Sequence, residues 1–188
     1  MQSIQTVSEN TIYVGASDRR LAKFENLFPI PRGVSYNAYV ILDEKTALLD
    51  TADASVGAQF LENVAAALDG RKLDYLIVDH MEPDHAAMIE AVLVRWPDLR
   101  LVVNAKALPM LKMYFPTDSA AIDDALVVKE GDTLDLGKHK LTFVMAPMVH
   151  WPEVMMTFDT TTGTLFSADA FGTFGALEGA LFADEVDF

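Results

Sequence analysis

Short apolar runs, separated by turn residues and one clear helical pattern, mark the first part of the chain. Strands are predicted at residues 11–15, 36–42 and 46–49, the last two as a hairpin, while residues 24–33, with two prolines, predict an irregular connector. From Phe60 to Leu68, apolar residues recur at three- and four-residue intervals, and a glycine follows at position 70. This pattern predicts an amphipathic helix that packs on a sheet.

The middle of the chain repeats the alternation of strand and helix. Leu73–Val78 is a short apolar run typical of a strand that is buried on both faces, and a helix is predicted to follow over residues 86–93. Another buried strand is expected at residues 101–103. A helix over residues 108–115, with Pro109 at its first position, comes next. Strands that alternate with helices favour an α/β fold.

The pattern changes to strands and tight turns from Ala125 onward. We expect antiparallel strands at 127–128, 134–136, 141–145, 154–158 and 164–166. His139 lies between two lysines in this region, and we predict that it faces solvent. The chain is therefore expected to place its helices outside a layered sheet arrangement.

The run His80-Met81-Glu82-Pro83-Asp84-His85 contains four metal-competent side chains directly after a predicted buried strand. His80 and Glu82 are two residues apart and can point the same way in extended backbone, while Asp84 and His85 open the next helix. Taken singly, each could belong to an ordinary solvated helix start, with Asp84 as the N-cap. Together, ionisable residues at the mouth of a buried strand indicate one half of a two-metal site.

A second proline-bounded loop carries another histidine. His150 follows a predicted strand within Ala146–Glu153, and Asp169 comes after the strand at 164–166. Each residue has a plain structural alternative, His150 as a buried histidine and Asp169 as a loop or N-cap acid. With the first run, however, they make three histidines and three carboxylates, and Asp169 is the natural bridge between two metals about 3.5–4 Å apart. Such a ligand set suits iron, manganese or zinc.

Composition narrows the range of functions. The chain has 188 residues, which predicts one domain, and 51% of them are hydrophobic, which is enough for a sizeable core. With 14 basic against 28 acidic residues and a net charge of −14, we expect no nucleic-acid partner. The absence of cysteine excludes disulfides and cysteine-ligated iron–sulfur or rubredoxin centres within the chain. Neither a signal peptide nor a membrane span of about 20 residues is apparent, so a cytoplasmic protein without a membrane partner is expected.

Several segments together match one family. They are Asp18–Arg20, Pro31–Asn37, His80–His85, Lys129–Asp132, Ala146–Glu153 and Ser167–Gly172. On these segments the chain resembles, over essentially its whole length, the diiron domain of flavodiiron proteins, the oxygen and nitric oxide reductases built on the metallo-β-lactamase fold. Hydrolases of that fold carry His-x-His-x-Asp-His, and Glu82 stands where their second histidine would be, which gives a harder ligand better matched to iron.

The resemblance implies a fold, a ligand set and cofactors. The fold is an α/β, metallo-β-lactamase-like αββα sandwich over residues 1–188, lacking its C-terminal part. His80, Glu82 and His150 would bind one iron, Asp84 and His85 the other, and Asp169 would bridge them. In some members the histidine matching His85 is not a ligand. The family's further histidine beyond Asp169 has no counterpart here, nor has its FMN-carrying flavodoxin domain.

The implied function is reduction of dioxygen to water, of nitric oxide to nitrous oxide, or of both, with electrons from FMN and a donor such as a rubredoxin. We expect a homo-oligomer of the full-length form, and we expect the chain to be a piece of a longer protein rather than a naturally short relative. Two alternatives stay open. One is a dizinc metal-dependent hydrolase, and the other is a non-catalytic module, either an oxygen-binding domain or an inactive remnant of the fold.

Overall fold

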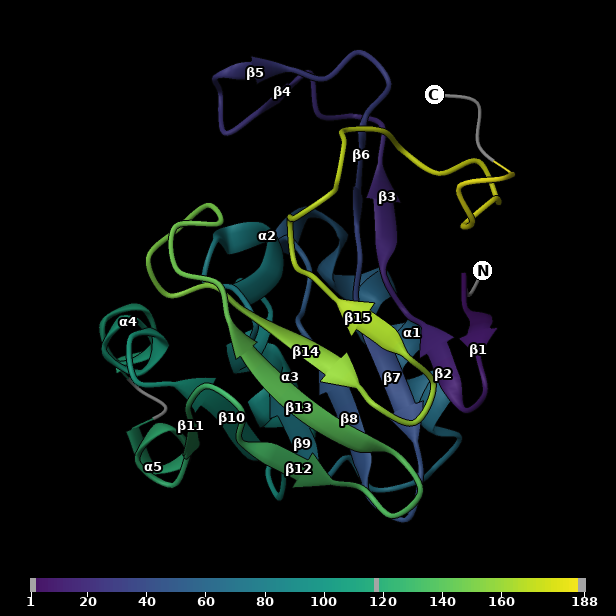
Figure 1. The fold of residues 1–188 in the computed structure, drawn as a ribbon. Helices are drawn as coiled ribbons and strands as arrows, with labels where there is room; N and C mark the ends of the chain where they lie inside the picture. The colour runs from purple at the N-terminus through teal and green to yellow at the C-terminus, as the bar shows by residue number, and fades with distance from the viewer. Residues whose placement is uncertain (1–2, 117–118, 186–188) are drawn as a thin grey trace.

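Two β-sheets packed face to face form the centre of the molecule. The computed structural model describes residues 3–116 and 119–185. The larger sheet has seven strands in the order β1 (Gln5–Ser8), β2 (Thr11–Tyr13), β7 (Tyr39–Leu42), β8 (Thr46–Leu49), β9 (Tyr75–Ile77), β10 (Arg100–Asn104) and β11 (Leu126–Val128). The smaller, antiparallel sheet has the order β12 (Thr133–Asp135), β13 (Lys140–Met145), β14 (Met155–Asp159) and β15 (Thr164–Phe166). Figure 1 shows the smaller sheet in green in front of the larger one.

The helices cover the other face of the larger sheet. They are a 3₁₀ turn η1 (Ala54–Val56), α1 (Gly57–Leu68), α2 (Pro83–Ala86), α3 (Ile89–Arg95), α4 (Ala107–Tyr114) and α5 (Ser119–Asp123). Two two-stranded antiparallel sheets, β3 (Ala16–Asp18) with β6 (Val34–Tyr36) and β4 (Lys23–Phe24) with β5 (Phe28–Pro29), lie at one end. Helices, sheet and sheet thus form three successive layers.

Burial on both faces explains the apolar runs of the central strands. In β8, Leu48 belongs to the core under the helices, where Phe60 of α1 also lies, whereas Leu49 belongs to the core between the two sheets. The same alternation separates Leu76 from Ile77 in β9. Successive side chains of a strand point to opposite faces, so a strand between two cores needs an apolar residue at every position.

Strands β8, β9, β10 and β11 are parallel, so their carboxyl ends lie at one edge of the sheet. The hairpin of β7 and β8 and the strand β9 confirm the sequence pattern, except that Tyr36 belongs to β6 and the hairpin begins at Tyr39. One expectation about strand pairing was wrong. The strand β11 pairs in parallel with β10 in the larger sheet instead of joining the antiparallel run that follows it.

The helix predicted over residues 86–93 is interrupted. Both the backbone N–H and the hydroxyl of Thr51 donate to the carbonyl oxygen of His85, at 2.8 and 2.6 Å. This contact removes that carbonyl from the helical ladder, and α2 and α3 form as separate segments. Helix α4 begins one residue earlier than predicted, at Ala107, and the five-residue α5 was not expected.

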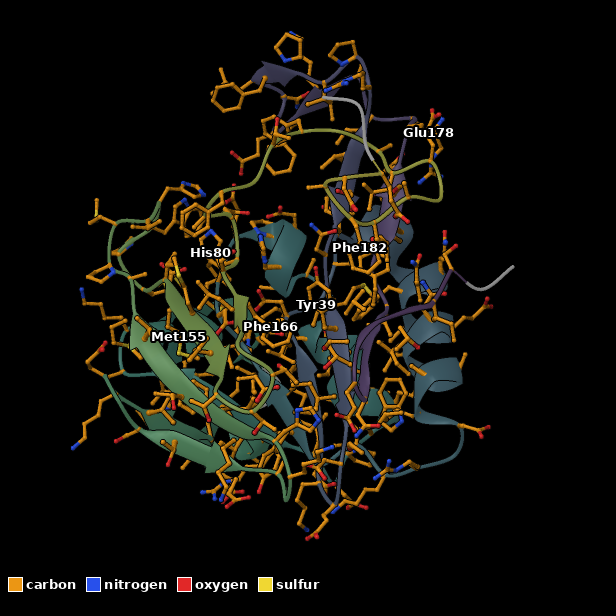
Figure 2. The ribbon with its side chains drawn as sticks, turned by 45° about the vertical axis from the view of Figure 1, so that its right-hand side comes forward. Tyr39, His80, Met155, Phe166, Glu178 and Phe182 are labelled. Atoms are coloured by element: carbon orange, nitrogen blue, oxygen red, sulfur yellow. The ribbon has the colours of Figure 1, made fainter. Side chains whose placement is uncertain are left out.

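A cavity of about 1060 Å³ opens where the two sheets meet the segment after β15. Its lining includes Tyr39, Phe166 and Phe182, which are labelled in Figure 2, and the rings of Tyr39 and Phe166 lie 5.2 Å apart. After β15 the chain runs beside β3 and β6, where the N–H of Leu177 donates to the hydroxyl of Ser17. Across the described ranges, none of the helices is long and apolar enough to cross a membrane.

Candidate metal centre

The loop after β9 carries the first half of the site. Pro83 occupies the first turn of α2, with Glu82 as the N-cap residue and Asp84 in the first turn, where a carboxylate suits the helix dipole. The N–H of His85 donates to the carbonyl of Glu82, which closes the turn. This tight geometry at the carboxyl end of a buried strand turns the side chains of His80, Glu82 and His85 inward, and all three are buried.

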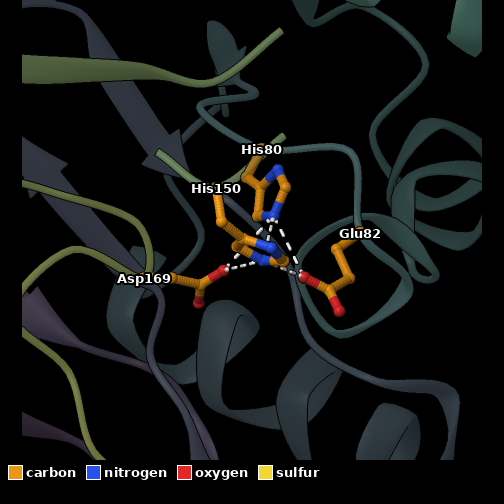
Figure 3. Close-up of side chains that lie close together, drawn as sticks. All are labelled: His80, Glu82, His150 and Asp169. Carbon is orange, nitrogen blue, oxygen red and sulfur yellow. Dashed lines mark hydrogen bonds and ion pairs between the residues drawn. The ribbon is translucent and has the colours of Figure 1, made fainter. Parts of the chain in front are cut away.

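Four side chains from three loops converge on one point (Figure 3). His80 Nε2 lies 3.1 Å from Glu82 Oε2 and 3.4 Å from His150 Nε2, and His150 Nε2 lies 2.7 Å from Glu82 Oε2. Asp169 completes the group, because its Oδ2 is 3.2 Å from the Nε2 atoms of both His80 and His150. We call these four residues the first group.

A second group shares Asp169 with the first. His85 Nε2 lies 2.8 Å from Asp169 Oδ1 and 3.7 Å from Asp84 Oδ2. Asp169 therefore presents one carboxylate oxygen to each group, as expected for a bridging residue. In both groups the potential ligand atoms lie within 4.8 Å of one another.

Two buried carboxylates contact the ring nitrogens of His80 and His85 that point away from the metal groups. His80 Nδ1 lies 2.8 Å from Glu153 Oε1, and His85 Nδ1 lies 3.0 Å from Asp50 Oδ2. Asp50 follows β8 with φ = +55°, in the left-handed region, and also accepts a hydrogen bond from the N–H of Asp79. Both rings thus direct Nε2 into the site.

The electrostatics of the site favour positive charge. Burial by itself lowers the pKa of His80, but hydrogen bonds to Asp169, Glu153 and Glu82 raise it to about 11. Burial raises the pKa of Asp84 to about 6, and the charges of Glu82 and Asp169 act in the same direction. For Asp169, burial is outweighed by hydrogen bonds from His80 and His85, and its pKa lies well below the usual value. A cation between these oxygens and nitrogens would satisfy the same groups.

The donor atoms fit metal ions well. Each group combines imidazole nitrogens with carboxylate oxygens and contains no thiolate, which suits iron, manganese or zinc. Asp84 Oδ1 is buried and has no hydrogen-bond partner among the described residues. A buried carboxylate oxygen without a donor is costly, and a bound cation would relieve that cost.

All six residues singled out from the sequence come together here. Reasoning from sequence assigned no role to Glu153 or Asp50, although a carboxylate directly after a buried strand was a usable signal for Asp50. It also missed Glu25, in the connector between β4 and β5. Burial and the nearby charge of Glu82 raise the pKa of Glu25.

His139 does not face solvent, contrary to the prediction. Its side chain is fully buried, and Nδ1 lies 2.8 Å from Asp159 Oδ2. The backbone N–H of His139 donates to Asp43 Oδ2, in the turn between β7 and β8. The residue therefore links a turn of the smaller sheet to a turn of the larger one, and it belongs to neither metal group.

Comparison with known proteins identifies the relatives of this chain. Residues 34–187 match the model of a family described as ODP family beta lactamase. An anaerobic nitric oxide reductase flavorubredoxin from Klebsiella pneumoniae is 38% identical over 183 residues, which are 96% of this chain and 37% of the relative. A putative diflavin flavoprotein from Thermosynechococcus vestitus is 39% identical over 169 residues, 88% of this chain and 28% of the relative. The chain thus spans well under half the length of these relatives.

Solved structures give the same fold. The rubredoxin oxygen:oxidoreductase of Desulfovibrio gigas superposes with a TM-score of 0.91 at 31% identity, covering 98% of this chain and 45% of that one. The flavodiiron protein of Giardia intestinalis gives a TM-score of 0.90 at 28% identity, covering 97% and 44%. The fold is the metallo-β-lactamase-like one that the sequence predicted.

Proposed function

Because the chain belongs to the ODP family of beta-lactamase domains, we propose that it is the diiron domain of a flavodiiron reductase. The proposed reaction is reduction of dioxygen to water, of nitric oxide to nitrous oxide, or of both. His80, Glu82 and His150 would hold one iron, Asp84 and His85 the other, and Asp169 would bridge them. The names of the relatives, a nitric oxide reductase and an oxygen oxidoreductase, support this reaction class.

The observation that carries the proposal is the position of Asp169 between two ligand groups. One of its oxygens lies 3.2 Å from His80 Nε2 and the other 2.8 Å from His85 Nε2. Glu82 adds an anionic oxygen to the first group, which favours iron over a hydrolytic zinc pair. When bound, iron supplies sites for the substrate and exchanges electrons with it.

The chain itself holds and shields the centre. The side chains of His80 and Glu82 are almost fully buried, whereas that of His150 is 55% exposed and lies on the open side of the first group. A small substrate would enter beside His150. FMN, a rubredoxin-type electron donor, assembly into a homo-oligomer and a cytoplasmic location belong to the same proposal, with FMN bound outside these 188 residues.

Metal content and activity together test the proposal. Protein loaded anaerobically with Fe(II) should bind two irons per chain and consume nitric oxide or dioxygen when a reduced flavin donor is supplied. Zinc-loaded protein should hydrolyse neither esters nor thioesters. The variant Glu82→His should lose much of its preference for iron over zinc. Two zincs with hydrolysis, or no turnover with either metal, would overturn the proposal.

A further inference from the structure

Glu153 is buried behind the first group and has no place among the proposed ligands. Glu153 is 1% exposed. One of its carboxylate oxygens, Oε1, lies 2.8 Å from His80 Nδ1 and 3.0 Å from the backbone nitrogen of Met81. A carboxylate can only accept at this contact, so Nδ1 carries the proton. His80 Nε2 is then left to face Glu82, His150 and Asp169.

The backbone of Glu153 is fixed by the larger sheet. Asn104, the last residue of β10, donates from Nδ2 to the Glu153 carbonyl at 2.5 Å. Its Oδ1 accepts from the N–H groups of Lys106 and Ala107 at 2.9 and 3.0 Å, at the start of α4. The same loop is held again by Lys106, whose Nζ donates to the Pro152 carbonyl. The position of Glu153 is thus fixed by hydrogen bonds from the end of β10 and the start of α4, and not by its own loop alone.

From this arrangement we infer that Glu153 is a positioning residue, which orients His80 and raises the metal affinity of the first group specifically. The inference rests on the proposed metal binding. A carboxylate behind a metal-binding histidine fixes the ring and increases its basicity, and its loss costs roughly 10–100-fold in affinity. Asp50 stands in the same relation to His85 in the second group, so each metal position has its own supporting carboxylate.

Site-resolved iron binding tests the inference. Fe(II) is titrated anaerobically into the whole protein against a chromophoric chelator, and two affinities are fitted. Glu153→Gln, which keeps the side-chain size, should weaken one site by about 10–100-fold and leave the other within error. Asp50→Asn should weaken the other site. The matched control is Glu178→Gln, whose carboxylate is 78% exposed at the surface, and it should change neither site.

A double-mutant cycle separates positioning from a general structural effect. If Glu153 acts through His80, adding Glu153→Gln to the His80→Ala variant should lower iron affinity no further. Adding it to the His85→Ala variant should lower iron affinity by the same factor as in wild type. In the two-iron protein it should also change the Mössbauer parameters of only one iron. Unfolding midpoints of the metal-free variants show whether each one folds.

The outcomes are distinct. Wild-type protein that binds no Fe(II) would overturn the proposed function and the role of Glu153 with it. Two irons in the wild type with equal losses at both sites in Glu153→Gln, or with no loss, would overturn the positioning role alone. An undiminished loss in the His80→Ala background would do the same. If Glu153→Gln does not fold, Asn104→Ala is used instead, because it removes the hydrogen bond to the Glu153 carbonyl. Asn104→Ala should weaken iron binding at the first group, and equal losses at both sites or no loss would again overturn the positioning role.

Discussion

Replacing Asp159 by alanine should destabilise the protein strongly, although the residue belongs to neither metal group. Asp159 accepts hydrogen bonds from His139 Nδ1 at 2.8 Å, from the Thr162 hydroxyl at 2.7 Å and from the Thr161 N–H at 2.9 Å. Both His139 and Asp159 side chains are 0% exposed, and His139 Nε2 already lacks a partner among the described residues. Without Asp159, neither ring nitrogen would have one.

Leaving a hydrogen-bond donor without an acceptor costs about 1–3 kcal/mol when it is buried. Three donors, His139 Nδ1, the Thr161 N–H and the Thr162 hydroxyl, lose this acceptor, so the total loss should be about 3–5 kcal/mol. With a urea m-value of about 2 kcal/mol/M, the unfolding midpoint of metal-free Asp159→Ala should fall by roughly 1.5–2.5 M. The control is Lys140→Met on the same sheet, since Lys140 pairs with Asp135 at 2.7 Å but both side chains are about 60% exposed. Its midpoint should stay within error of wild type. Equal shifts for the two variants, or no shift for Asp159→Ala, would refute this account of the buried pair.

Two further predictions concern Gly15, which lies just before β3, and Asp18, the last residue of β3. Gly15→Ala should abolish folding or lower the unfolding midpoint sharply, because the added Cβ would lie 2.0 Å from the Tyr36 carbonyl oxygen. The control Gly175→Ala, with open space around the added Cβ, should leave the midpoint unchanged. Similar midpoints for the two variants would contradict this prediction. Hydrogen bonds from Arg20 lower the pKa of Asp18 from 3.8 to about 2 despite the opposing effect of burial. Wild type should therefore be more stable than Asp18→Asn above about pH 5, and this difference in unfolding free energy should shrink as the pH falls from 4 towards 2. Urea unfolding at a series of pH values measures the difference. A difference that grows on acidification would disprove the pairing of Asp18 with Arg20.

Local sequence patterns identified all six residues of the two groups because these residues lie in segments that follow strands. The strand β9 was visible as an apolar run, and the abrupt change to His80 and Glu82 marked its carboxyl end. Asp169 was predicted to bridge because it is the next acid at a strand end, and the structure places one of its oxygens in each group. The parallel strands β8 and β9 bring their carboxyl ends to one edge of the larger sheet. In the smaller sheet, β13 and β15 both pair antiparallel with β14, so they run in the same direction and their carboxyl ends also lie at one edge. The segments that follow β9, β13 and β15 supply the proposed ligands.

The failures have a common physical cause. The burial of His139 depends on Asp159 and Asp43, which are 20 and 96 residues away, and the two flanking lysines gave the opposite signal. The strand β11 is a short apolar run of three residues, and only its pairing with β10 assigns it to the larger sheet. The break between α2 and α3 arises from Thr51, in the loop after β8. Each depends on contacts that no local pattern contains.

The most direct test of the central claim is Mössbauer spectroscopy of ⁵⁷Fe-loaded protein, because the claim is that Asp169 joins two metal positions into one centre. Wild type should show two irons per chain that are magnetically coupled. Asp169→Asn should lose the coupling together with iron from at least one position. Two uncoupled irons in the wild type, or coupling that survives in Asp169→Asn, would contradict the account.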